Sequence, residues 1–335
     1  MASYAVPPIY AAFVWWFSTG AVLLLVGRSD RLGILRAVSV TGLIAGSLLG
    51  LALTANETTV GAAYTAFTCT ILLWGAQEIA FLGGWLTGPR PEACPVGVAG
   101  WHRLGFALQA ILYHELALLL SGFIVLALTS GGLNSVGLWT FAALWVLRQS
   151  AKINLFLGVP VTNDELMPDG VKFLKSYFAR KSVGAFFPIS VTLATAALVI
   201  MIQRIVEVAV TPFDIVSLTL VSTLFALGVV EHWFMLLPLP VITLWGWGTR
   251  SPFPPEDKIM EKGPDTKAAN TPPKLVVLSS VRPDPVLAKP PSVCARQRLE
   301  DQFRQRFLEQ NARGDLASAL SVSAEPAVTA NGRTS

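Results

Sequence analysis

Long apolar stretches alternate with short polar segments along the first 248 residues of the chain. Seven such stretches run near residues 8–27, 37–55, 60–86, 104–128, 135–158, 183–206 and 214–247. Each approaches or exceeds the ~20 residues that an α-helix needs to cross a bilayer. The pattern therefore predicts an all-α fold, a polytopic membrane helix bundle of about seven transmembrane helices. The last stretch is long enough to tilt or break at Pro238 and Pro240.

The predicted loops differ in their content of Lys and Arg. Basic residues gather in the loops at 27–36, 87–103 and 163–181, whereas the loops at 54–59, 129–134 and 207–214 contain none. These two sets of loops alternate along the chain, as expected if they lie on opposite sides of a membrane. Because Lys and Arg favour cytoplasmic loops, the asymmetry predicts a periplasmic N-terminus and a cytoplasmic C-terminus.

The overall composition agrees with a membrane protein. Hydrophobic residues make up 53% of the 335 residues and charged residues only 14%, well below the roughly 25% charged residues of a typical soluble domain. The net charge of +4 comes largely from loops and the C-terminal region, so it indicates topology rather than nucleic-acid binding. The three cysteines include no CxxC pair and indicate no disulfide framework. The N-terminus lacks a basic region and is predicted to be a first membrane helix rather than a cleaved signal peptide.

The composition changes after Gly248. We predict two regions: a transmembrane bundle over 1–248, and a mostly disordered cytoplasmic tail over 249–335, rich in Pro and charged residues. Within the tail, residues 296–310 place four apolar residues at helical spacing: Leu299, Phe303, Phe307 and Leu308. This segment is compatible with a short amphipathic helix on a membrane or a partner, and equally with a solvated helix.

Ionisable residues interrupt four of the apolar stretches. The residues are Glu78, His114, Glu115, Arg148, Lys152, Glu231 and His232. At about 1.5 Å rise per residue they fall within one slab of the membrane. Arg148 and Lys152 are four residues apart and share one helical face, so we predict that they face Glu78, Glu115 and Glu231 across the bundle. A lone charge at the bilayer centre costs at least ~2.5–3.5 kcal/mol, and such pairing offsets most of that cost.

Several roles are open for this cluster. It could be an ion-pair network that fixes the order of the helices, or it could relay protons. His114 and His232 are candidate cofactor ligands, for a metal or the magnesium of a chlorophyll-type pigment such as bacteriochlorophyll. The sequence contains no HExxH and no paired ExxH, so a catalytic metal site lacks its usual spacing, and no catalytic residue is assigned. His102, beside Trp101, is predicted to lie at the membrane interface rather than to act as a ligand.

Several segments together resemble a known family of membrane proteins. They are "AFTCTILLWGAQEIAFLGGWLTGPR", "ILYHELALL", "RQSAKINLFLGVP", "FLKSYF" and "VVEHWFMLLPLP". As an ordered set they are similar to the PuhE-type family of photosynthetic complex assembly proteins of anoxygenic phototrophic bacteria. The resemblance covers roughly residues 1–248, and the segment 160–178 matches less closely than its neighbours.

The resemblance implies a multi-pass protein of the bacterial inner membrane that helps to build or regulate the reaction centre and its light-harvesting antenna. Its expected partners are reaction-centre or light-harvesting subunits, other assembly factors and membrane lipid, with a link to bacteriochlorophyll supply. The sequence leaves a second class open, namely a membrane enzyme or proton-coupled transporter that uses the polar cluster. A water-filled cavity at the cluster would favour this second class. A closed ion-pair core with an apolar outer groove would favour an assembly factor that acts by binding.

Overall fold

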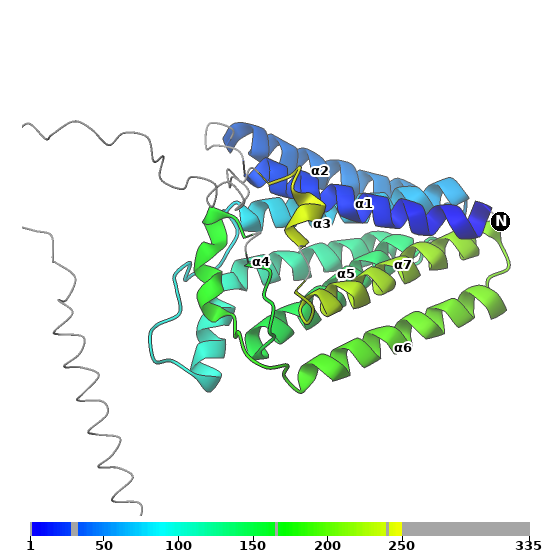
Figure 1. The fold of residues 1–335 in the computed structure, drawn as a ribbon. Helices are drawn as coiled ribbons and strands as arrows, with labels where there is room; N and C mark the ends of the chain where they lie inside the picture. Colours follow the sequence, from blue (N-terminus) through cyan, green and yellow to red (C-terminus); the bar gives the residue numbers. More distant parts are fainter. Residues whose placement is uncertain (1, 28–32, 165–166, 239–240, 250–335) are drawn as a thin grey trace, which may run out of the picture. The chain divides into compact units, whose positions relative to one another are not determined.

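The computed structural model describes residues 2–27, 33–164, 167–238 and 241–249. Within these ranges seven long α-helices form the fold, and most of them run side by side (Figure 1). They are α1 (Ala2–Val26), α2 (Gly33–Thr54), α3 (Val60–Leu82), α4 (Gly100–Thr129), α5 (Val136–Leu157), α6 (Phe186–Glu207) and α7 (Pro212–Phe234). The described residues contain no β-strand, so the predicted all-α class is confirmed. The predicted tail lies outside the described residues except for Thr249, and so does its segment 296–310.

Six of these helices are long and apolar enough to cross a membrane; α5 is the exception. Its 22 residues match the other helices in length, but Arg148, Lys152 and Asn154 make it more polar. The polar helix packs against α3, α4, α6 and α7, so other helices cover much of its surface. The fold is therefore a membrane helix bundle whose most polar long helix lies among the others.

The central helix of the bundle is α3. It packs against α1, α2, α4, α5 and α7, and it is by far the most buried of the six apolar helices. Its Phe67 and Leu73 join Leu118 of α4 and Leu220 of α7 in the main apolar core. Most residues on α3 are therefore covered by other helices, which makes it a suitable helix to carry an acidic side chain.

Local interactions explain where these helices begin and end. Thr59 caps α3 by accepting a hydrogen bond from the backbone N–H of Ala62 at 3.1 Å. Thr211 and Asp214 form a reciprocal capping box at the start of α7. The sequence predicted that the third span continues to residue 86, but α3 ends at Leu82. Gly84 has a φ of +80°, which turns the chain away from the helix.

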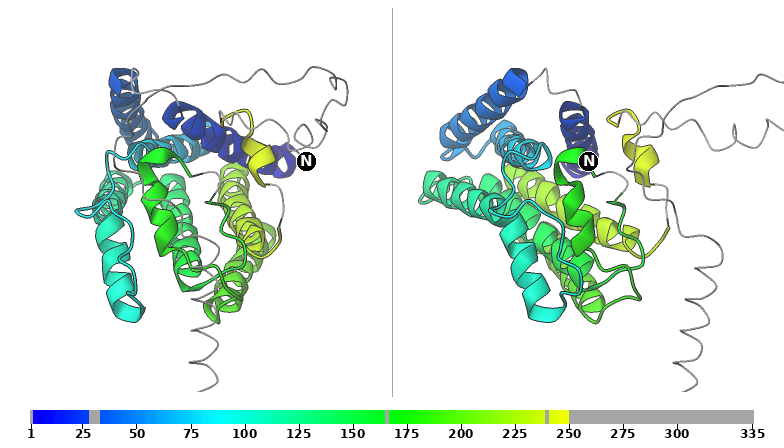
Figure 2. Two further views of the ribbon diagram at one scale, coloured as in Figure 1. Left: turned by 60° about the vertical axis from the view of Figure 1, so that its left-hand side comes forward. Right: turned by 90° about the vertical axis from the view of Figure 1, so that its left-hand side faces the viewer.

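The loop after α3 packs directly against the middle of α4. A Cβ atom on Gly88 would lie 1.9 Å from the carbonyl oxygen of Gln109, so only glycine fits there. The neighbouring Thr87 carbonyl accepts a hydrogen bond from the backbone N–H of His114 at 3.1 Å. Both views of Figure 2 show the first turns of α4 running crosswise to the rest of the helix. Insertion of a foreign carbonyl into the hydrogen-bond ladder is a known cause of such a bend.

The chain turns back after α7, as the two prolines predicted. Helix α7 ends at Phe234, ahead of Pro238, and a short 3₁₀ segment, η4 (Val241–Trp245), follows. This segment contacts α1: Trp16 Nε1 donates to the Leu244 carbonyl at 2.8 Å, and Trp245 Nε1 donates to the Trp16 carbonyl at 2.9 Å. The predicted seventh span, 214–247, is thus one helix followed by a separate segment.

The basic loop between α5 and α6 contains the nine-residue 3₁₀ helix η3 (Asp169–Tyr177). Its buried residues Val171, Leu174 and Tyr177 pack with Phe81 and Ala110 in a small second core beside α3 and α4. The Tyr177 hydroxyl donates to the Glu92 carbonyl at 3.0 Å, and burial raises the pKa of this phenol. The loop is thus a packed part of the fold, although the sequence predicted only a basic connection.

Candidate functional site

Four helices carry the polar cluster that the sequence singled out. Glu78 lies on α3, His114 and Glu115 lie on α4, Arg148 and Lys152 on α5, and Glu231 and His232 on α7. The structure brings these side chains into mutual electrostatic range around Arg148 and Lys152. The arrangement is possible because residues four apart share one face of α5, which has α3, α4 and α7 as neighbours.

Arg148 pairs with Glu78. One guanidinium nitrogen lies 3.4 Å from Oε1 of Glu78, and Trp74 Nε1 donates to the same oxygen at 3.1 Å. The Glu78 side chain is only 8% exposed, whereas the Arg148 side chain is 44% exposed. The second carboxylate oxygen of Glu78 is buried and has no hydrogen-bond partner among the described residues.

Lys152 pairs with Glu115. Its Nζ lies 2.5 Å from Oε1 of Glu115, and Gln149 Nε2 donates to Oε2 of the same carboxylate at 2.6 Å. Both oxygens of Glu115 therefore have a donor from α5. This double contact ties α4 to α5 through three side chains.

Glu231 has a different partner from the one the sequence predicted. Trp15 on α1 donates its indole N–H to Oε1 of Glu231 at 3.0 Å. Within the described residues, Glu231 forms no ion pair, although Arg148 interacts with it electrostatically at longer range. The two bases of α5 are thus each matched to one acid, and the third acid is hydrogen-bonded to an indole.

The two candidate histidine ligands have opposite surroundings. His232 is 1% exposed, its Nδ1 donates to the Gly228 carbonyl at 2.7 Å, and its Nε2 lies 2.8 Å from the Ser150 hydroxyl. Both ring nitrogens of His232 are therefore already engaged, so it has no free nitrogen for a metal or pigment.

His114 is fully buried, and neither ring nitrogen has a hydrogen-bond partner among the described residues. Its ring stacks on Phe81 with centroids 4.1 Å apart. A free nitrogen is present, but the closed packing leaves no room for a macrocycle beside the ring. The residues present therefore do not fit a bacteriochlorophyll at either histidine.

No other metal-binding group appears in the part of the chain that the structure describes. Nowhere there do three His, Cys, Asp or Glu side chains gather closely enough to hold a metal ion.

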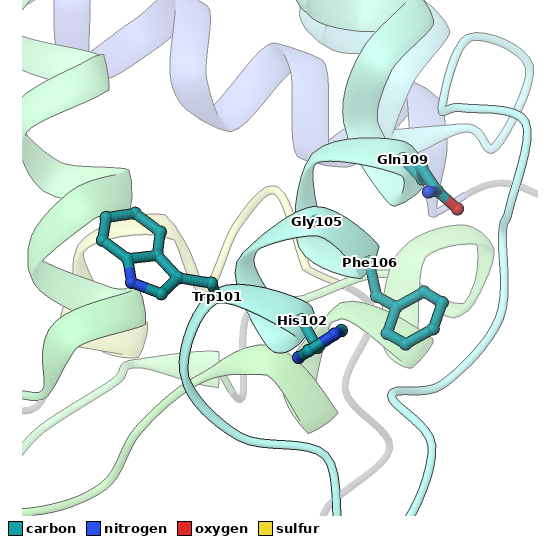
Figure 3. A pocket seen from close by; sticks show the side chains of 5 residues that line it. All are labelled: Trp101, His102, Gly105, Phe106 and Gln109. Atoms are coloured by element: carbon teal, nitrogen blue, oxygen red, sulfur yellow. The ribbon is translucent and has the colours of Figure 1, made fainter.

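A shallow pocket of about 290 Å³ lies at the start of α4 (Figure 3). Its lining residues are Trp101, His102, Gly105, Phe106 and Gln109. All five come from one helix, and the indole of Trp101 points away from the rings of His102 and Phe106 (Figure 3). Because no second element supplies a converging polar group, this pocket has none of the usual features of a catalytic site.

The loop that follows α5 is held by its own charged group. Asp164 is bonded by Arg180 and Thr162, with the Thr162 hydroxyl at 2.8 Å, and Lys175 Nζ lies 3.6 Å away. Burial acts to raise the pKa of Asp164, but the hydrogen bonds from Thr162 and Arg180 outweigh it and hold the pKa below its ordinary value. This cluster lies outside the membrane-spanning helices and anchors the loop.

Several members of the site had no signal of their own in the sequence. Trp15 and Trp74 resemble the other tryptophans of the spans, and only the structure shows that each donates to a carboxylate. Gln149 and Ser150 could have been included, because they belong to the same polar run of α5 as Arg148. Their contacts with Glu115 and His232 make α5 the polar centre of the bundle.

These features define a class: a polytopic membrane helix bundle with a paired polar cluster at its centre. The chain belongs to the family described as "Protein of unknown function (DUF3623)", which matches residues 1–256. It is 38% identical over 258 residues to a protein of Rhodobacter capsulatus named "Uncharacterized 30.4 kDa protein in puhA 5'region". That alignment covers 75% of this chain and 93% of the relative. No solved structure matches the chain.

Proposed function

We propose that this protein is an assembly or regulatory factor for the bacterial reaction centre and light-harvesting complex. One observation carries the proposal: the relative with 38% identity is named for its place in the 5' region of puhA. Genes that lie together in bacteria commonly serve one process. The resemblance to PuhE-type proteins points the same way.

The geometry supports action by binding rather than by catalysis. Two of the three acids in the cluster are held by a base and a second donor, as expected for a network that fixes helix order. The outer face of α4 is strongly apolar, with Leu116, Leu120 and Phe123 more than half exposed. In a bilayer such a face contacts lipid or the helix of another membrane protein. We therefore propose membrane subunits of the photosynthetic apparatus, and other assembly factors, as partners.

We also propose the membrane and the orientation. The protein lies in the inner or intracytoplasmic membrane, with its N-terminus in the periplasm and its tail in the cytoplasm, because the Lys- and Arg-rich loops alternate. Pigment ligation by His114 or His232 is not part of this proposal, since one ring has no free nitrogen and the other has no space.

Deletion of the gene in the phototroph that encodes it tests the proposal. We expect the absorbance of assembled reaction centre and antenna to fall and to return when the wild-type gene is restored. Respiratory complexes measured in the same membranes serve as the control and should be unchanged. Purification of a tagged, full-length protein in mild detergent should recover reaction-centre or antenna subunits. Normal complexes in the deletion strain, together with no such subunits in the purified sample, would refute the proposal.

A further inference from the structure

The charges of the polar cluster do not balance. At the level of the cluster the helices contribute three carboxyl groups, Glu78, Glu115 and Glu231, and two fixed cations, Arg148 and Lys152. If every carboxyl group were ionised and both imidazoles were neutral, one negative charge would be left over. An uncompensated charge inside a membrane protein is costly, so the cluster needs one additional positive charge.

The ion pairs show which carboxyl group is left over. Glu78 has Arg148 at 3.4 Å and the indole of Trp74, and Glu115 has Lys152 at 2.5 Å and the amide of Gln149. Among the described residues Glu231 has only the indole N–H of Trp15, a neutral donor. A single hydrogen bond from a neutral group does not compensate a full charge in a medium of low dielectric constant.

Neither histidine is well placed to supply the missing charge. His114 is fully buried without an acceptor for either ring nitrogen among the described residues, so an imidazolium there would carry two unsatisfied N–H groups. His232 is already satisfied as a neutral ring: its Nδ1–H donates to the Gly228 carbonyl, and its Nε2 can accept from the Ser150 hydroxyl. Within the described part of the chain, the neutral form satisfies both nitrogens of His232, and at His114 it leaves one N–H group unsatisfied instead of two.

We propose that Glu231 is a proton-binding site inside the membrane, with its carboxyl group in the neutral form. Oε1 accepts the hydrogen bond from Trp15, and the proton is bound at Oε2. The proton comes from a hydronium ion of the aqueous phase: one O–H bond of hydronium breaks, one O–H bond forms at the carboxylate, a water molecule is released and no electron is transferred. The ligand of this site is the proton itself, and the site is independent of any role in photosynthetic assembly.

The helices do not fully cover the cluster around Glu231. Arg148, which interacts electrostatically with Glu231, has a side chain that is 44% exposed. The charged and titratable groups that act on Glu231 are Arg148 of α5, Glu78 of α3 and the adjacent His232. Lys152, His114 and Glu115 belong to the same cluster through Glu78 and Arg148. From α1 the contact is the uncharged Trp15.

Infrared spectroscopy of the purified full-length protein tests the protonation directly. At neutral pH the wild-type protein should show the C=O stretch of a protonated carboxyl group. The band should be absent in Glu231→Gln, unchanged in the control Glu57→Gln, whose side chain lies in an exposed loop, and shifted in Trp15→Phe, which removes the hydrogen bond to Oε1. A wild-type spectrum without this band, or a band that persists in Glu231→Gln, would overturn the proposal.

Thermal unfolding in detergent provides a second, matched comparison. Gln imitates a neutral carboxyl group, so Glu231→Gln should change Tm little. The same substitution at Glu78 or Glu115 leaves Arg148 or Lys152 unpaired and should lower Tm by about 5 °C or more. A loss of folding in Glu231→Gln, or a fall in Tm as large as in the other two variants, would mean that Glu231 is ionised and would overturn the proposal. Neither measurement requires photosynthetic complexes.

Discussion

Arg148 and Glu78 form the ion pair for which a single substitution has the clearest consequence. Glu78 is only 8% exposed, so Arg148→Leu leaves a buried carboxylate without its cation. Because the Arg148 side chain is itself 44% exposed, we expect the free energy of unfolding to fall by about 1–3 kcal/mol, the usual cost of leaving a buried polar group without its partner. Denaturation of the purified protein in mild detergent measures this change.

A second substitution in the Arg148→Leu background identifies the partner. Adding Glu78→Gln should recover part of the lost stability, because the orphaned charge is removed. Adding Glu115→Gln should recover none, since Glu115 pairs with Lys152. Equal recovery with both acids, or strictly additive effects with both, would contradict the pairing seen here.

Asp164 gives a pH dependence outside the membrane. Its pKa is lowered in the folded protein, so its contribution to stability is complete above the ordinary carboxyl value of about 4 and is lost as the pH falls further. Asp164→Asn should therefore lower Tm at neutral pH and flatten the acid side of the Tm–pH profile. Asp169→Asn is the matched control, because that side chain is 89% exposed. An unchanged acid profile in Asp164→Asn would contradict this assignment.

At the scale of single residues, the sequence located the cluster but not its pairing. Charged residues are so rare in apolar stretches that Glu78, Arg148 and Glu231 were visible without a structure. Their partners depend on the rotation of each helix, which no local pattern encodes. His114 and His232 look alike in sequence, each beside a glutamate, yet one ring has no hydrogen bond and the other has two.

Among the elements, α4 depends on the loop that packs against it. The Cβ of Gly88→Ala would lie 1.9 Å from a backbone oxygen of Gln109, which cannot move as a side chain can. We expect a loss of at least about 1–3 kcal/mol in unfolding free energy, as for other overpacked sites. The change is measured by thermal or denaturant unfolding of the purified variant.

Gly105→Ala in the same helix is the control for this substitution. An added Cβ at Gly105 meets nothing within 4 Å. Alanine also favours helix over glycine by about 0.5–1 kcal/mol, so this variant should be as stable as the wild type or more stable. If Gly88→Ala were equally well tolerated, the close approach of the loop to α4 would be wrong.

The helices themselves were predictable, because an apolar run of about 20 residues leaves few alternatives. The ends of the helices were less predictable. Helix α3 ends at Leu82, because Gly84 turns the chain, and α4 begins at Gly100, four residues before the predicted span. The 3₁₀ helix η3 was missed altogether. Its three buried residues recur at every third position, the repeat of a 3₁₀ helix, and they pack against Phe81 and Ala110.

At the scale of the whole molecule, the orientation is a prediction from the basic loops. Reporter fusions in the loop at 129–134 and after Arg250 should lie on opposite sides of the membrane, the first outside and the second inside. Reporters that need export, such as a phosphatase, and reporters that need the cytoplasm should give complementary signals. The same signal from both positions would exclude the arrangement.

The C-terminal region is expected to be dispensable for insertion. Truncation after Arg250 removes a segment whose composition cannot support a core, so the remaining protein should still be recovered from membranes. Truncation after Phe234 is the informative comparison, because it also removes the segment that contacts α1. Fractionation and thermal unfolding of both variants would show whether the boundary near residue 250 is correct.

The return of residues 241–249 to α1 imposes an order on biosynthesis. Helix α1 leaves the ribosome before the other six helices described here, and in the fold its Trp16 is hydrogen-bonded to Leu244 and Trp245, while Gly20 leaves space for the ring of Trp247. Those contacts cannot form until residues 244–247 have been made. During translation α1 is therefore in the membrane before its contacts with this segment can form. Until then lipid, the insertion machinery or another protein must cover that face of α1. The bundle can therefore close at α1 only after all seven described helices have been synthesised.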